Sequence, residues 1–346
     1  MAATSTQSTN ASQPESQPRP RPGPQPGNSS IARGTVVPVL VGLLIGAIFA
    51  AVFLAAFHDP RPHDLPVAVV GPPPVTDAVA AQSAAGGDAF DVRPYASPEM
   101  AREAVRTHAV SGAFVAGTPA SELIVAGANG PSVTEVLTHA FGAAAAASGA
   151  TLTVTDIAPL AAGDSRGLSV FYAAFGVVLA GFLFGLTSMQ AGPRLPALWR
   201  AVSAVVFAFL VSIVVAWLVG PVFDALPASF LMTGTLIGLL ALAVGVTTAA
   251  LLKLLGPVGI FVSAVVLLVF GNATSTGILP AQFLPGWLEP LTGILPVGVT
   301  VRALRGAAYF DNDGVASGIA VLEAWIFGAV ILYGIAVVVQ RRRRGA

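Results

Sequence analysis

The chain has 346 residues, of which 55% are hydrophobic and only 10% are charged. Soluble proteins carry about a quarter charged residues, so this composition indicates an integral membrane protein. The sequence contains no cysteine, which excludes disulfides, thiolate nucleophiles and cysteine-based metal sites. The formal net charge is zero, but the charges are unevenly distributed along the chain.

The first 33 residues are rich in Ser, Thr, Gln, Pro and Gly and include PRPRPGPQPG at 18–27. Such a segment buries too little apolar surface to offset the entropy of ordering, so we predict a disordered tail over residues 1–33. Binding of this tail to a proline-recognising partner is the less favoured alternative.

Six apolar runs are long enough to cross a bilayer core of about 30 Å at about 1.5 Å per residue. They cover residues 36–57, 168–189, 199–220, 229–252, 256–271 and 319–340. The first run has small residues near its outer end, as a cleaved signal peptide has, but it exceeds the usual signal core of about 7–15 residues. We therefore predict an α-helical polytopic membrane protein with six transmembrane helices, five of them in a membrane domain over 168–340.

The charge distribution orients these spans. With a cytoplasmic N-terminus, the inner segments hold ten of the seventeen basic residues and one acidic residue, Glu15. The run Arg341–Arg344, in a short basic tail over 341–346, is part of this inner set. Because basic residues favour the cytoplasmic side, both termini are predicted to be cytoplasmic.

Between the first two spans, residues 58–167 are enough for one small domain. The pattern predicts strands at 65–70, 110–117, 121–127 and 151–156, and helices at 97–109 and 131–147. Ser97 is the expected N-cap of the first helix. We predict an α+β extracytoplasmic domain without the basic stripe that nucleic-acid binding requires.

The sequence offers little catalytic chemistry. The only lysine, Lys253, precedes Leu254, so no phosphate-binding GxxxxGK[ST] motif exists. The stretch HDPRPHD at 58–64 carries two His-Asp pairs that could hold a metal, but a solvated stalk is the favoured interpretation. No nucleophile elbow is present. We predict no enzymatic activity, no cofactor and no metal.

The segment 272–318 stays apolar although prolines at 280, 285, 290 and 296 interrupt it. It is predicted to form short broken helices packed against the spans, because non-helical backbone at membrane depth must be buried or line a cavity. Arg302 and Arg305 lie three residues apart on one helical face. They could meet an anionic lipid or substrate, or pair with Asp311, Asp313 or Glu323 as a structural lock, which is the favoured alternative.

Glu323 is expected about one turn inside the last span, where a carboxylate is costly. Facing a polar pathway and reaching the outer interface are equally consistent with its position. Small-xxx-small pairs at Gly42/Gly46, Gly181/Gly185 and Gly234/Gly238 are typical of closely packed helices, in a bundle or in a dimer.

Two stretches resemble the permeases of the ABC-2 exporter type, in particular the phage-infection-protein (Pip)-like branch. One is EMAREAVRTHAVSGAFVAG at 99–117, and the other is FGNATSTGILPAQFLPGWLEPLTGILPVGVTVRALRGAAYFD at 270–311. The resemblance covers about residues 36–340. It implies a bacterial plasma-membrane subunit that forms a homodimer or heterodimer and exports a hydrophobic or amphipathic substrate, powered by a separate P-loop ATPase.

In this framework the candidate outer gate or structural lock consists of Arg302, Arg305, Glu323 and Asn272, the last from the Gly-Asn pattern of the family. The chain departs from the family where the ATPase docks. A Pro/Gly-rich tail replaces the amphipathic helix that the family has before the first span. The family's structured loop between the second and third spans is here only QAGPRLPAL at 190–198. A Pip-like receptor or secretion scaffold without transport is therefore the alternative function.

Overall fold

The computed structural model describes residues 28–85, 88–192 and 195–345. Most of the predicted tail, residues 1–27, lies outside these ranges. Helix α1 (Asn28–Phe57) includes residues 28–33, which the sequence analysis assigned to the tail. The chain divides within α1, after Leu44, into two units. The packing described below is that of the second unit, from Ile45 onwards.

The described residues contain five helices that are long and apolar enough to cross a membrane. They are Val39–Phe57 within α1, α5 (Ser169–Ala191), α6 (Ala197–Trp217) with its π-helical end η2 (Leu218–Val222), α7 (Phe230–Leu255), and α11 (Val315–Gly345). The chain is therefore a multi-pass membrane protein. The basic residues predicted as a separate tail continue α11, and Ala346 lies outside the described ranges.

The predicted span 256–271 forms a shorter apolar helix, Pro257–Ala273. It consists of α8 (Pro257–Ser263), the π-helical stretch η3 (Ala264–Phe270) and α9 (Gly271–Ala273). Gly256 at φ +62° separates it from α7, a conformation that glycine adopts without steric cost. The structure thus supports five long spans directly, and the sixth predicted span is a helix of reduced length.

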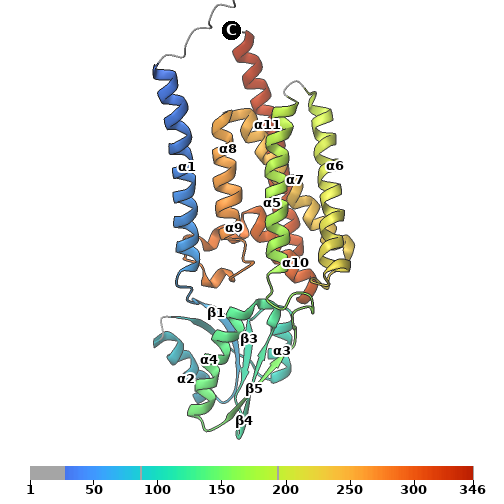
Figure 1. Ribbon diagram of the computed structural model, residues 1–346. Coiled ribbons are helices and arrows are strands. Elements are labelled where there is room, and N and C mark those ends of the chain that lie inside the picture. The colour runs from blue at the N-terminus through green and yellow to red at the C-terminus, as the bar shows by residue number, and fades with distance from the viewer. Residues whose placement is uncertain (1–27, 86–87, 193–194, 346) are drawn as a thin grey trace, which may run out of the picture. The chain divides into compact units, whose positions relative to one another are not determined.

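Helix α7 is the centre of the helical bundle and packs against α5, α6, α8, α10 (Pro296–Tyr309) and α11 (Figure 1). Small residues let α5 approach it closely. A Cβ at Gly181 would lie 3.0 Å from Val244 Cβ, and a Cβ at Gly185 would lie 2.6 Å from the carbonyl oxygen of Gly245. The Gly181/Gly185 pair therefore serves packing within one chain, as small-xxx-small pairs do between membrane helices.

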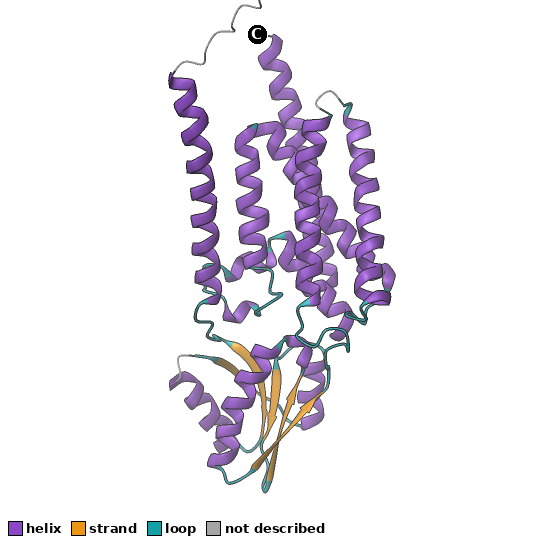
Figure 2. Cartoon of the chain, in the orientation of Figure 1, coloured by secondary structure: helices purple, strands orange, loops and turns teal. Residues whose placement is uncertain are grey.

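The region between α1 and α5 contains a five-stranded mixed sheet of order β2-β1-β3-β4-β5, whose strands are orange in Figure 2. Three of the four pairings are parallel, and only β3 with β4 is antiparallel. The strands are β1 (Leu65–Val70), β2 (Phe90–Pro94), β3 (Gly112–Val115), β4 (Ala120–Val125) and β5 (Thr151–Asp156). Parallel neighbours need crossover helices, so the region is a mixed α/β domain and not the predicted α+β arrangement.

Three helices supply these crossovers: α2 (Pro73–Ala85), α3 (Pro98–Arg106) and α4 (Pro131–Ala147). Strands alternate their side chains between two faces. In β1, Leu65, Val67 and Val69 pack with α4 in one core cluster, whereas Ala68 packs with α3 in another. The N-cap prediction is confirmed, because Ser97 Oγ accepts a hydrogen bond from the Met100 amide at 3.3 Å.

The proline-rich segment is broken as predicted, into the 3₁₀ turns η4 (Ala281–Phe283) and η5 (Glu289–Gly293) followed by α10. Its apolar side chains enter the core of the mixed sheet. Leu279 and Phe283 join the cluster on the α4 face, and Phe310 joins the cluster on the α3 face. The segment stays apolar because its side chains pack against the mixed α/β domain as well as against the helical bundle.

Replacing Gly185 with Ala is expected to destabilise the bundle by about 1–3 kcal/mol, because the added methyl group overpacks the α5–α7 contact. Gly176 on the same helix is the matched control, since a Cβ there meets nothing within 4 Å. Thermal unfolding of both variants in detergent measures the difference. Equal melting temperatures for the two variants would contradict a tight α5–α7 contact.

Candidate functional site

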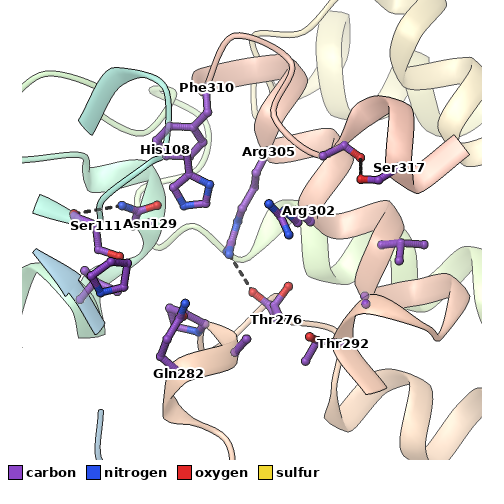
Figure 3. A pocket seen from close by; sticks show the side chains of 18 of the residues that line it. His108, Ser111, Asn129, Thr276, Gln282, Thr292, Arg302, Arg305, Phe310 and Ser317 are labelled. Atoms are coloured by element: carbon purple, nitrogen blue, oxygen red, sulfur yellow. Dashed lines mark hydrogen bonds between the residues drawn. The ribbon is translucent and has the colours of Figure 1, made fainter. Parts of the chain in front are cut away.

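A cavity of about 360 Å³ lies where the mixed α/β domain meets the broken segment, α10 and the start of α11 (Figure 3). The domain contributes His108, Ser111 and Asn129 to its wall. The broken segment contributes Thr276, Gln282 and Thr292. The cavity therefore has walls from the α/β domain and from the broken segment, with Arg302 and Arg305 of α10 between them.

Helix α10 positions the two arginines because its other faces are buried. Pro296 occupies its first turn, where the missing N–H costs nothing. Its buried apolar side chains, which join the main core of the bundle, are Val297, Val299, Val301, Ala303 and Leu304. Burial of these residues fixes the rotation of α10, so that the i, i+3 pair of arginines reaches toward the cavity (Figure 3).

The guanidinium of Arg305 binds backbone carbonyls. Nη1 donates to Thr276 at 2.7 Å, and Nη2 donates to Gly277 at 2.9 Å and to Gly167 at 3.1 Å. Gly167 lies directly before α5, so one side chain joins three separate segments. Within the described ranges no carboxylate forms an ion pair with Arg305. The buried carboxylate of Asp164 acts electrostatically on the guanidinium without hydrogen bonding to it.

Arg302 takes part in a three-residue cluster. Its Nε and Nη2 donate to the carboxylate of Asp313 at 3.1–3.3 Å, and His108 Nδ1 lies 3.0 Å from Asp313 Oδ2. The ring of His108 also stacks on Phe310 with centroids 4.3 Å apart. We call Arg302, Asp313 and His108 the clasp, because they tie α10 and the following loop to the mixed α/β domain.

A second ion pair lies beside the clasp. Arg106, at the end of α3, binds Asp311 in the α10–α11 loop. Asp311 and Asn312 adopt positive φ angles of 48° and 68°, in the left-handed region that Asp and Asn tolerate best. The sequence FDNDG at 310–314 thus forms a tight turn that presents Asp311 to Arg106 and Asp313 to His108 of the domain.

The hydrogen bond from His108 is the main cause that lowers the pKa of the Asp313 carboxyl. The charge of Arg302 acts in the same direction, and partial burial opposes both. A carboxyl whose pKa is lowered on folding stabilises the folded state above its ordinary pKa of about 4. That contribution is lost as the pH falls through the lowered value.

The four candidate residues from the sequence do not all come together. Arg302 and Arg305 line the cavity, and Arg302 pairs with Asp313, one of the three carboxylates considered for a lock. Glu323 is exposed on α11 and pairs with neither arginine. Asn272 is buried and is not one of the residues that line the cavity. Its Nδ2 donates to the Leu268 carbonyl at 2.6 Å. Its Oδ1 has no partner within the described ranges.

The sequence analysis missed His108, Asn129, Gln282 and Phe310 as cavity residues. No local pattern indicates them, because they meet only through tertiary packing. The FDNDG turn was a usable signal, since Asp and Asn next to Gly favour positive φ. It would have indicated a sharp reversal between α10 and α11.

The stretch 58–64 was interpreted as a solvated stalk, with a metal site as the less favoured alternative. Its charged side chains form pairs with one another and with a later segment. His63 Nε2 lies 3.3 Å from Glu289 Oε2, and Asp59 pairs with Arg61. In the part of the chain that the structure describes, no group of three or more His, Asp or Glu side chains is arranged to hold a metal. The arrangement at 58–64 is that of a connector whose charges pair locally and with η5.

The fold therefore defines a multi-pass helical membrane protein with a mixed α/β domain between its first two long helices. Comparison of the chain with protein-family models, with curated proteins and with solved structures finds no match.

Replacing Asp313 with Asn is expected to lower stability at pH 7 by about 1 kcal/mol, the scale of partly exposed ion pairs. The difference from the parent chain should shrink as the pH falls below about 4 and through the lowered pKa of Asp313, because protonation then removes the negative charge of the parent carboxyl. Melting temperatures at pH 7 and over a series of lower pH values down to pH 2 measure this. Asp91→Asn is the control, since among the described residues the ion pair of Asp91 is with Arg93 on its own strand. A difference for Asp313→Asn that does not decrease anywhere in this series would argue against a charged clasp.

Proposed function

We propose that the chain is the membrane permease subunit of an ABC-2 type exporter and moves a hydrophobic or amphipathic substrate with a separate ATPase. One observation carries this proposal. The two stretches that resemble the family, 99–117 and 270–311, are far apart in the sequence but supply opposite walls of the same cavity. His108 and Ser111 come from the first stretch, and Arg302 and Arg305 come from the second.

The proposal includes a topology of six spans with both termini in the cytoplasm of a bacterial cell. The fifth span is the helix Pro257–Ala273, whose 17 residues give a length of about 25 Å, somewhat less than a typical hydrocarbon core. This orientation places the mixed sheet and the cavity outside. A broken segment that lines a cavity is also the arrangement tolerated at membrane depth.

The inner end of α5 and α6 is the proposed docking point for the ATPase. Arg200 is buried and donates to the carbonyls of Ser188 and, at 2.6 Å, Gly192. These bonds hold the end of α5 against the start of α6. The first turn of α6 exposes Leu198 and Trp199, with exposed fractions of 72% and 62%. A small, rigid, apolar patch is therefore available for a partner.

The second candidate function is a Pip-like receptor or secretion scaffold that does not transport. The observation that favours it is the size of the inner connection, because only residues 192–196 separate α5 from α6. In this case the extracytoplasmic domain would bind the ligand, and the membrane helices would form a homodimer or anchor the domain.

Affinity purification of the tagged chain from its native cells in mild detergent, followed by mass spectrometry, tests the proposal. We expect a P-loop ATPase at stoichiometric level. Replacing Leu198 with Ser should reduce the bound ATPase severalfold, because burying a leucine side chain contributes about 1.5–3 kcal/mol.

Leu231→Ser is the matched control, since Leu231 is 79% exposed near the outer end of α7. It should retain the ATPase. If the parent chain brings down only envelope proteins or a second copy of itself, the exporter proposal fails and the scaffold function takes its place.

A further inference from the structure

The cavity adjoins a second, apolar hollow. This groove has a volume of about 560 Å³ and runs between α7, the α8–η3 helix and α11. Gly293 and Val321 line both the cavity and the groove, so the two meet at these residues. Trp325 lies just beyond the junction, where its indole Nε1 donates to the Ile294 carbonyl at 2.8 Å.

The groove follows one face of α11 for a considerable length. Its lining positions on that helix have the spacing of a helical stripe, namely Val321, Ala324, Trp325, Gly328, Ala329 and Leu332. From the first to the last of them the helix rises about 16 Å, roughly half of a bilayer core. Nearly all of the lining is apolar, and Thr247 is its polar side chain. An acyl chain of one leaflet matches this length and chemistry.

Two arginines line the cavity at the outer end of the groove. Among the described residues its lining includes Arg302 and Arg305 but no Asp or Glu. Asp313 pairs with Arg302. Asp164 acts electrostatically on Arg305 without hydrogen bonding to it, and the hydrogen bonds of Arg305 go to carbonyl oxygens. Arginine is the side chain best suited to phosphate, because its planar fork donates two parallel hydrogen bonds. Hydroxyl and amide groups of Ser111, Asn129 and Gln282 complete the wall.

We propose that the cavity and the groove together bind one anionic glycerophospholipid. Its phosphate lies against Arg302 and Arg305, and an acyl chain follows α11 toward the middle of the membrane. This assignment deepens the proposed function, on which it rests for the role of the lipid as transported substrate. Binding itself requires only the chain described here.

The two arginines and the apolar groove select different parts of the ligand. A free phosphate satisfies the arginines but leaves the groove empty. A zwitterionic phospholipid fills the groove and brings a phosphate, but its quaternary ammonium is repelled by the two guanidinium groups. An anionic glycerophospholipid meets both demands without this repulsion. The junction at Gly293 is open, since a Cβ there would contact nothing within 4 Å, so a chain can pass from cavity to groove.

Native mass spectrometry of the purified full chain tests this assignment. The protein is released from detergent micelles that contain dioleoyl phosphatidylglycerol or dioleoyl phosphatidylcholine at the same mole fraction. We expect one phosphatidylglycerol per chain, bound at least about tenfold more tightly than phosphatidylcholine, the ratio for one charge-assisted hydrogen bond of about 1.4 kcal/mol or more. Glycerol 3-phosphate at the same concentration should not displace the lipid.

Two variants separate the headgroup from the chain. Arg302→Gln should weaken phosphatidylglycerol binding about tenfold, and Asp313→Asn, which breaks the clasp but keeps the arginine, should not. Gly328→Leu should weaken it to a similar extent by filling the groove. Its control is Gly334→Leu on the same helix, because a Cβ at either glycine meets nothing within 4 Å and Gly334 lies outside the groove.

Equal retention of the two lipids, displacement by glycerol 3-phosphate, or unchanged binding in Gly328→Leu would each overturn the assignment. These outcomes are independent of the ATPase experiment. Lipid binding without an ATPase would leave a lipid-binding scaffold, and an ATPase without lipid binding would leave an exporter with another substrate.

Discussion

The cavity exists because the segment between α9 and α11 completes the core of the mixed sheet. Leu279 and Phe283 fill one face of that sheet and Phe310 fills the other. Each such burial contributes roughly 1.5–3 kcal/mol, whereas a partly exposed ion pair contributes about 1 kcal/mol or less. Apolar packing therefore holds the domain against the bundle. The clasp and the Arg106–Asp311 pair set the register of that contact and leave the arginines at its edge.

Much of the fold could be predicted from the sequence where the signal is local. Helix α4 and strand β5 have the predicted bounds, because a proline opens the helix and β-branched residues fill the strand. Helix α2 and strand β2 were missed. Strand β2 is a five-residue edge strand with no fully buried side chain, so it lacks the apolar alternation that predicts strands. The missed pair adds one of the three parallel pairings, that of β1 with β2. The other two join strands that were predicted, and their parallel direction follows from crossovers that the local signals do not specify.

The site was less predictable because its parts are distant in the chain. The spacing of Arg302 and Arg305 identified a cationic face, but nothing local placed His108 opposite it, nearly two hundred residues earlier. Glu323 was a reasonable partner by its position near a span end. The rotation of α11, set by burial of Leu322 and Ala329, instead leaves it exposed on another face. Helix rotation depends on tertiary packing, which hydropathy alone does not specify.

Two arginines bind α5 through backbone carbonyls, one near each end. Arg200 donates to Ser188 and Gly192 at the C-terminal end, and Arg305 donates to Gly167 just before the N-terminal end. The 23 residues of α5 form a rod about 35 Å long with tight contacts to α7 along its side. In mechanical terms α5 is a stiff link, so a displacement of its C-terminal end at Arg200 would reach the guanidinium of Arg305 with little loss to bending.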